Sequence, residues 1–366
     1  MEPYRRIVIK IGSSSLTNND KLLDIAKLKA LAHAVAELFK QGWQPILVSS
    51  GAVATGLGHL GWNRTNLTMP ERQAAASVGQ GLLMEKYNEL FQAQGMKVGQ
   101  ILLTRADFAD RRRYLNARNT LNVLLNSQVL PIVNENDTVT VAEIRFGDND
   151  TLSALVAGLV EADLLVLLTD IDGLYSGDPR KDPNAKLIPV VRQVDENIIK
   201  IAGDSGSTVG TGGMRTKLSA ARIAARSGVR TVVASAKEPR ILLDIAAGEK
   251  LGTSILPSNH TLRSRKQWIA YGSIARGILT IDKGAVKALT EKHKSLLAVG
   301  VTNIKGNFQP GSVVSIVDEQ GMELAKGITN LSSEDLNLAI KESQHGLEVI
   351  NRDWLVCERS FSTCQV

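Results

Sequence analysis

The chain has 366 residues, enough for two domains, and its 43% hydrophobic and 22% charged residues are ordinary for a soluble globular protein. Two cysteines, Cys357 and Cys364, exclude a disulfide framework and favour the reduced cytosol, and no apolar run approaches membrane-spanning length. The net charge of +6 lies in the first 265 residues, because 11 basic and 11 acidic residues cancel beyond them. We expect a cytoplasmic protein without a signal peptide, with a mild positive charge that suits small anionic substrates.

The first two-thirds of the chain alternate short apolar runs with amphipathic stretches. Runs rich in Val, Ile and Leu predict strands buried on both faces at residues 6–11, 45–49, 98–104, 129–133, 164–169 and 229–234. Amphipathic stretches predict helices at residues 25–41, 71–94, 111–127, 151–161 and 214–227. Gly42, Gly95 and Gly228 follow three of these helices, where glycine commonly ends a helix. The alternation predicts an α/β fold: an open, mostly parallel sheet with helices on both faces.

The pattern changes after Leu256. Residues 257–274 carry polar and basic side chains, and we interpret them as a linker. Short strand-like runs follow at residues 277–281, 295–299, 312–317 and 323–327, with glycine-containing turns between the later ones. We therefore expect a large α/β domain over residues 1–256 and a small β-rich domain over residues 275–366.

Lys10 lies within the first apolar strand, where a lysine is costly to bury unless it meets an anion. Gly12 and the three serines that follow it offer a backbone that can approach a phosphate closely. A surface lysine at a strand end is an equally good interpretation of the residues alone.

Ser49, Ser50 and Gly51 follow the second strand and precede a predicted helix, whose free N–H groups could bind an anion. Taken alone, a simple helix cap is the better interpretation of these serines. Residues 56–61 match G-x-G-x-x-G, but they lie too far beyond the strand for a dinucleotide fingerprint. We expect these glycines to form a loop after a short helix, and we disfavour a nicotinamide dehydrogenase.

Two clusters of amides and carboxylates lie between the fourth strand and the next helix. They read Asn134-Glu135-Asn136-Asp137 and Gly147-Asp148-Asn149-Asp150. Together they could grip the amino group and the carboxylate of one small molecule. Helix capping explains Asp148 or Asp150 equally well, but it does not explain the density of the first cluster.

Two further segments could face a nucleotide. Thr169 and Asp170 end a buried strand, where they form either a simple turn or part of a pocket. Residues 204–217 form a glycine-rich loop that runs into a helix, and Lys217 lies about one turn inside it, where a cation opposes the helix dipole unless an anion binds. The chain thus offers the positive charge and N–H groups that phosphoryl transfer needs, without a Walker A motif.

Taken together and in order, these segments resemble the amino acid kinase family. The likeness covers nearly the whole chain and is carried by Lys-Ile-Gly-Ser, Ser-Ser-Gly-Ala-Val-Ala, Leu-Leu-Thr-Arg-Ala-Asp, Tyr-Leu-Asn-Ala-Arg-Asn-Thr, Pro-Ile-Val-Asn-Glu-Asn-Asp, Phe-Gly-Asp-Asn-Asp-Thr-Leu-Ser-Ala and Gly-Thr-Gly-Gly-Met-Arg-Thr-Lys. The tail from about Ala275 resembles a PUA domain, a small module that binds RNA in other proteins. The resemblance implies the amino acid kinase fold and ATP-dependent phosphorylation of the γ-carboxylate of L-glutamate, the first step of proline biosynthesis.

The resemblance also implies a role for each motif. Lys10 and Lys217 would contact the ATP phosphates and stabilise the transferring phosphoryl group, and Asp150 would orient the lysines. Ser50, Asn134, Asp137 and Asn149 would hold the glutamate. Nucleotide binding would involve Lys10, Gly12, Thr169, Asp170, Thr211, Gly212, Gly213, Met214, Arg215, Thr216 and Lys217. Mg²⁺ would bridge the phosphates of ATP with few protein ligands.

The same resemblance implies partners. These are a glutamyl-phosphate reductase that uses the labile product, proline as a feedback inhibitor, and further copies of the chain in a dimer or tetramer. RNA is disfavoured, because the C-terminal region is neutral and nucleic-acid binding usually needs a basic surface. Another carboxylate or carbamate kinase of the same fold is the main alternative, and the cluster at residues 134–137 and the C-terminal module argue against it.

Overall fold

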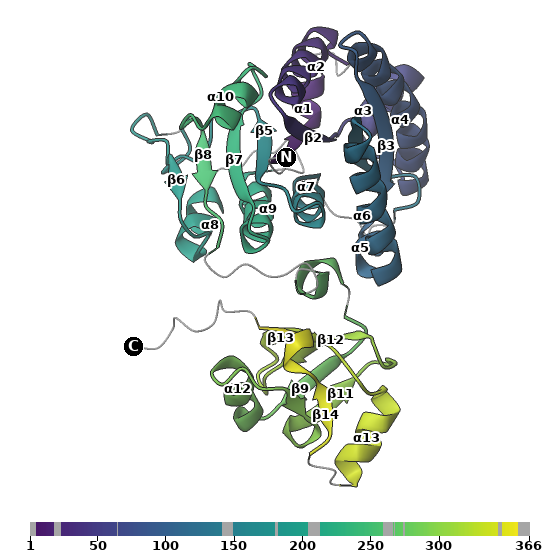
Figure 1. Cartoon of the computed structure of the whole chain (residues 1–366), viewed down its shortest axis with the longest axis vertical. Coiled ribbons are helices and arrows are strands. Elements are labelled where there is room, and N and C mark those ends of the chain that lie inside the picture. Colours follow the sequence, from purple (N-terminus) through teal and green to yellow (C-terminus); the bar gives the residue numbers. More distant parts are fainter. Residues whose placement is uncertain are drawn as a thin grey trace. The chain divides into compact units, whose positions relative to one another are not determined.

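The computed structural model describes residues 5–17, 23–63, 65–140, 149–179, 182–203, 213–258, 266, 268–273, 275–342 and 346–357. The chain divides into two compact units. The first comprises Met1–Asp107 and Arg112–Leu262, and the second comprises Phe108–Arg111 and Arg263–Val366. Each unit has its own sheet and its own hydrophobic core (Figure 1). Within the described part of the chain, no helix has both the length and the hydropathy needed to cross a membrane.

The first unit is built on an eight-stranded sheet with the order β3-β4-β2-β1-β5-β7-β8-β6. Its strands are β1 (Arg5–Ile11), β2 (Trp43–Val48), β3 (Lys97–Leu103), β4 (Val129–Glu135), β5 (Leu164–Thr169), β6 (Val190–Val191), β7 (Arg230–Ser235) and β8 (Thr253–Ile255). Neighbouring strands run parallel except β7 and β8, so the predicted mostly parallel sheet is confirmed. The sequence did not predict β6 and β8, because two or three residues are too few for a periodic pattern.

The helices of the first unit are α1 (Ser13–Leu16), α2 (Ile25–Lys40), α3 (Ala52–Leu60), α4 (Met69–Gln92), α6 (Arg111–Asn126, except Arg111), α7 (Asn149–Leu159), α8 (Glu196–Gly203), α9 (Met214–Arg226) and α10 (Ile241–Ala247). α5 (Arg105–Ala109) begins in the first unit, and its residues from Phe108 on belong to the second. α4 begins two residues earlier than predicted, because Thr68 and Glu71 cap its first turn reciprocally. Gly42, Gly95 and Gly228 follow α2, α4 and α9 with positive φ angles, as predicted.

Side-chain alternation along β1 decides which way Lys10 points. Ile7, Ile9 and Ile11 belong to the core that the sheet forms with α2, α4 and α10. Successive side chains of a strand point to opposite faces, so Lys10 lies on the other face. There α7 contacts β1 and β5, and α9 lies beside α7 (Figure 1). Lys10, near the carboxyl end of β1, therefore faces the N-terminal ends of two helices.

The prediction of a loop at residues 56–61 is wrong. Gly56 and Gly58 lie inside α3, and Gly61 ends the helix with φ of 66°. α3 and α4 touch backbone to backbone: a Cβ atom added at Gly56 would lie 1.8 Å from the carbonyl oxygen of Ala75, and one added at Gly79 would lie 1.9 Å from that of Ala52. These glycines serve helix packing, which a local sequence pattern does not reveal.

We expect Gly56→Ala to lower the free energy of unfolding by about 1–3 kcal/mol or more, because the new methyl group meets main-chain atoms that cannot rotate away. Gly81→Ala in α4 is the matched control. It meets nothing within 4 Å, and alanine in a helix interior is about 0.5–1 kcal/mol more favourable than glycine. Urea unfolding of both variants measures the difference, and a Gly56→Ala protein as stable as the wild type would contradict the packing argument.

The second unit contains a five-stranded sheet with the order β11-β9-β12-β13-β15 and a separate pair, β10 with β14. Its elements are a π-helix (Trp268–Gly272), β9 (Ile278–Ile281), α12 (Lys283–Thr290), β10 (Leu296–Leu297), β11 (Val301–Lys305), β12 (Val313–Val317), β13 (Glu323–Ile328), α13 (Ser333–Lys341), β14 (Glu348–Ile350) and β15 (Leu355–Cys357). The predicted strand at 295–299 is too long, because a 3₁₀ turn begins at Ala298. The predicted linker contains the π-helix, where the indole N–H of buried Trp268 donates to the Phe108 carbonyl.

Candidate active site

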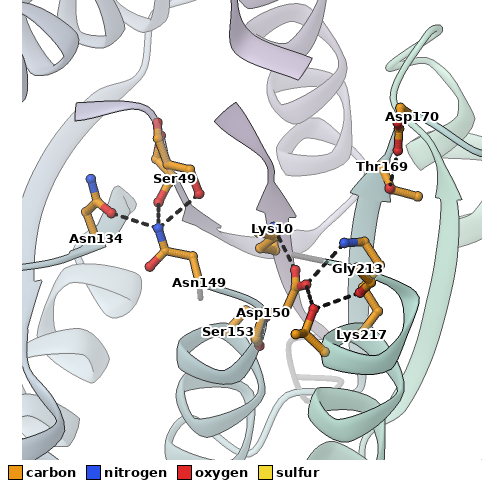
Figure 2. Close-up of polar contacts among 12 residues, drawn as sticks. Lys10, Ser49, Asn134, Asn149, Asp150, Ser153, Thr169, Asp170, Gly213 and Lys217 are labelled. Carbon is orange, nitrogen blue, oxygen red and sulfur yellow. Dashed lines mark hydrogen bonds and ion pairs between the residues drawn. The ribbon is translucent and has the colours of Figure 1, made fainter. Parts of the chain in front are cut away.

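Two buried lysines meet one buried aspartate at the carboxyl end of β1. Asp150, the second residue of α7, is 0% exposed, and Lys10 and Lys217 are 5% and 4% exposed. The Nζ atom of Lys10 forms an ion pair with Oδ1 of Asp150 at 2.6 Å, and that of Lys217 pairs with Oδ2 at 3.1 Å. The Thr216 hydroxyl donates to the same Oδ2 at 3.0 Å. Figure 2 shows Asp150 between the two lysines, which come from β1 and from the first turn of α9.

The positive charges of the two lysines explain why Asp150 is ionised although it is buried. Burial disfavours the charged carboxylate of Asp150, but the positive charges of Lys10 and Lys217 outweigh burial and hold its pKa below the ordinary value. Asp150 also lies at the N-terminal end of α7, where a negative charge is favourable. The two ammonium groups of the cluster can attract and neutralise an anion such as a phosphate.

An amide network adjoins the lysine cluster, because Asn149 precedes Asp150 on α7 (Figure 2). Its Nδ2 atom donates to the Ser49 carbonyl and the Ser50 hydroxyl at 2.9 Å each, and to Oδ1 of Asn134 at 3.1 Å. Ser49 and Ser50 follow β2, and Asn134 lies in β4. Three predicted acceptor-site residues, Ser50, Asn134 and Asn149, therefore come together.

The remaining predicted residues are placed around these two groups. Asp137 lies in a turn after β4. Thr169 ends β5, and its hydroxyl donates to the carboxylate of Asp170 at 3.0 Å. The residues that flank the two lysines are Gly12 between β1 and α1, and Gly213, Met214, Arg215 and Thr216 at the start of α9. The predicted nucleotide-binding residues Thr211 and Gly212, and the residues Gly147 and Asp148, lie outside the described part of the chain.

Two residues of α4 that belong to no sequence motif, Gln80 and Tyr87, also contact the amide network. Gln80 accepts a hydrogen bond from Nδ2 of Asn134 at 2.8 Å, and the Tyr87 hydroxyl lies 2.8 Å from that of Ser49. Both residues follow the spacing of the buried residues of α4, so they resemble ordinary core positions. The sequence offers one sign of a role for Gln80: it is a polar residue at a position where the helical period predicts an apolar side chain.

Comparison of the sequence with known proteins gives matches over both units. The amino acid kinase family matches residues 5–235, and the PUA domain matches residues 277–351. The chain is similar to proteins named glutamate 5-kinase from Caldanaerobacter subterraneus (46% identity, covering 96% of this chain and 97% of the relative), Vibrio vulnificus (48%, covering 96% of both) and Chromobacterium violaceum (50%, covering 94% and 92%).

Solved structures of lower identity share the fold of the first unit. A carbamate kinase from Giardia lamblia bound to AMP-PNP has a TM-score of 0.53 at 17% identity and covers 70% of this chain and 100% of its own. A UMP kinase from Bacillus anthracis has a TM-score of 0.51 at 17% identity and covers 70% and 98%. At this identity the likeness concerns the fold alone.

Proposed function

Because the chain belongs to the amino acid kinase family, we propose that it transfers a phosphoryl group from ATP to the γ-carboxylate of L-glutamate. The product is L-glutamyl 5-phosphate, and the reaction is the first step of proline biosynthesis. The observation that carries this proposal is the ion-paired cluster of two buried lysines and Asp150 beside an amide network. The relatives named glutamate 5-kinase support the choice of acceptor.

The chemistry needs little from the protein beyond position and charge. The γ-carboxylate is already ionised at neutral pH, so the reaction requires no general base. Lys10 and Lys217 neutralise the charge on the phosphoryl group while it passes between two oxygens in line. Asp150 keeps both ammonium groups at fixed positions, and this matters because a misplacement of about 1 Å can lower a rate about 100-fold.

The two substrates occupy opposite sides of Asp150 in this proposal. Ser50, Asn134, Asp137 and Asn149 bind glutamate through hydroxyl, amide and carboxylate groups. Gly12, Thr169, Asp170 and residues 211–217 bind ATP together with the two lysines. Gly213 caps α9, so the positive end of this helix adds to the charge of Lys217.

Mg²⁺ accompanies ATP and supplies further positive charge to its phosphates. Among the described residues, no group of three His, Cys, Asp or Glu side chains could hold a metal ion. Asp150 already pairs with both lysines. This donor set fits a cation that phosphate oxygens and water hold, as is common for Mg²⁺.

The proposal extends to the setting of the reaction. An acyl phosphate hydrolyses readily, so we infer that a glutamyl-phosphate reductase consumes the product promptly. We also infer that the protein acts in the cytosol as a homo-oligomer and that proline inhibits it. Residues 1–256 form the catalytic domain in this assignment, with a linker at 257–274 and a PUA-like domain at 275–366.

The experiment that tests the function measures ADP release from MgATP by the purified protein. L-Glutamate, L-aspartate, N-acetylglutamate and buffer alone serve as acceptors, and hydroxylamine traps any acyl phosphate. We expect hydroxamate with L-glutamate only. Hydroxamate with another acceptor would change the substrate, and ADP release without hydroxamate would contradict transfer to a carboxylate.

The side chain of Asp137 offers a direct test of the acceptor site. Hydrogen bonds to charged groups typically contribute 1.5–3 kcal/mol, so Asp137→Ala should raise the KM for L-glutamate about 10- to 100-fold. The KM for ATP should change less than about threefold, which makes it the internal control. Steady-state kinetics with each substrate varied in turn decide the matter, and an unaltered glutamate KM would remove Asp137 from the acceptor site.

A further inference from the structure

Helix α4 places two buried polar side chains behind the amide network of the acceptor site. Gln80 is 9% exposed and Tyr87 is 1% exposed, and their spacing of seven residues puts both on one face of the helix. Each contacts a different member of the network: Gln80 contacts Asn134, and Tyr87 contacts Ser49. Neither belongs to the residues that the proposed function uses.

Main-chain groups fix the orientation of both asparagine amides. The N–H of Glu135 donates to Oδ1 of Asn134 at 2.9 Å, so the Nδ2 atom of Asn134 points the other way, toward Gln80. The Ser49 carbonyl accepts from Nδ2 of Asn149. The Oδ1 atom of Asn149 must then point away from this carbonyl, and it is buried without a hydrogen-bond partner among the described residues.

The hydroxyl network has a fixed direction as well. The Ser49 hydroxyl donates its proton to the Ser50 carbonyl at 3.2 Å, so Tyr87 is the donor in its 2.8 Å contact with Ser49. Burial raises the pKa of the Tyr87 phenol, which therefore keeps its proton at any pH at which the protein works. Tyr87 thus holds Ser49, whose carbonyl in turn orients Asn149.

We propose that Gln80, assisted by Tyr87, is a positioning residue: Gln80 orients Asn134, and Asn134 and Ser49 together orient Asn149 to receive the amino group of the acceptor substrate. The inference rests on the proposed function and deepens it. A buried acceptor without a partner is unfavourable, and a bound donor removes that cost. At neutral pH the only strong hydrogen-bond donor of L-glutamate is its α-ammonium group. Oδ1 of Asn149 is therefore the oxygen that accepts a hydrogen bond from this ammonium group in the proposal.

The test compares Gln80→Met with Gln44→Met. Methionine keeps the length of glutamine and removes its amide. Gln44 is also buried and has two hydrogen bonds, to Arg6 and to the Leu125 carbonyl, but it lies near the start of β2, at the end of the strand opposite the site. For each protein we would measure kcat, the KM values for L-glutamate and ATP, and the inhibition constant of glutarate, which lacks the amino group.

We expect Gln80→Met to raise the glutamate KM about tenfold, with kcat, the ATP KM and the glutarate constant within about threefold of the wild type. Gln44→Met should lower stability only. Tyr87→Phe, a nearly isosteric change, should raise the glutamate KM about threefold, and it carries the test if Gln80→Met does not fold. Weaker binding of glutamate and glutarate alike, or wild-type glutamate KM values in both α4 variants, would overturn the inference. A wild-type protein that does not phosphorylate glutamate would instead overturn the proposed function.

Discussion

Replacing Lys217 with alanine is expected to lower kcat about 10²- to 10³-fold, the range found when a single group that stabilises transition-state charge is removed. In the proposed function, the buried ammonium group acts on charge that develops on the phosphoryl group during transfer, and the proposed glutamate site is the amide network on the other side of Asp150. The glutamate KM should therefore stay within about threefold of the wild type. Initial rates of hydroxamate formation with each substrate varied in turn provide the measurement.

Lys10→Ala is expected to lower kcat in the same way, because the ammonium group of Lys10 pairs with the other oxygen of Asp150. Lys40→Ala is the matched control, because Lys40 is exposed at the end of α2 and pairs only with Glu37 among the described residues. It should leave kcat unchanged. A folded Lys217→Ala protein with kcat within threefold of the wild type would remove the lysine from phosphoryl transfer, whatever happened to its substrate affinity.

The sequence predicted the sheet well, because buried parallel strands give continuous apolar runs that alternate with amphipathic helices. It also drew attention to Lys10, since a lysine within such a run is unusual. It could not decide the role of Asp150, because a carboxylate at the start of a helix is equally typical of a cap. That decision depends on the packing of α7 beside β1 and α9, which brings residues 10, 150 and 217 together.

Other features escaped prediction because they depend on contacts between helices distant in sequence. The sequence pattern predicted a loop at Gly56, yet the missing side chains of Gly56 and Gly79 allow α3 and α4 to touch. Gln80 and Tyr87 follow the period of the core positions of α4, and only the fold shows that both reach the amide network. Spacing identifies the buried face of a helix, but it does not identify what lies against that face.

Asp150→Asn is expected to destabilise the protein more than any other single change to the site. The substitution keeps the shape of the side chain but removes the negative charge with which Asp150 pairs two buried ammonium groups. Removing one partner of a buried ion pair typically costs about 3–5 kcal/mol. Asp24→Asn is the control: Asp24 pairs with the more exposed Lys27 and caps α2, and asparagine retains the cap, so the loss should stay below about 1 kcal/mol.

The pH dependence of this loss tests whether the negative charge of Asp150 is its cause. The native pKa of Asp150 lies below its ordinary value of 3.8, so the carboxylate stabilises the fold at pH values above 3.8. This stabilisation disappears as the pH falls through the native pKa and the carboxylate takes up a proton. The difference in unfolding free energy between wild type and Asp150→Asn should therefore be constant from about pH 8 to about pH 5 and should shrink below about pH 4. Urea unfolding across this range measures the difference, and a difference that stayed the same down to the lowest accessible pH would mean that the ionised carboxylate is not the source of the lost stability.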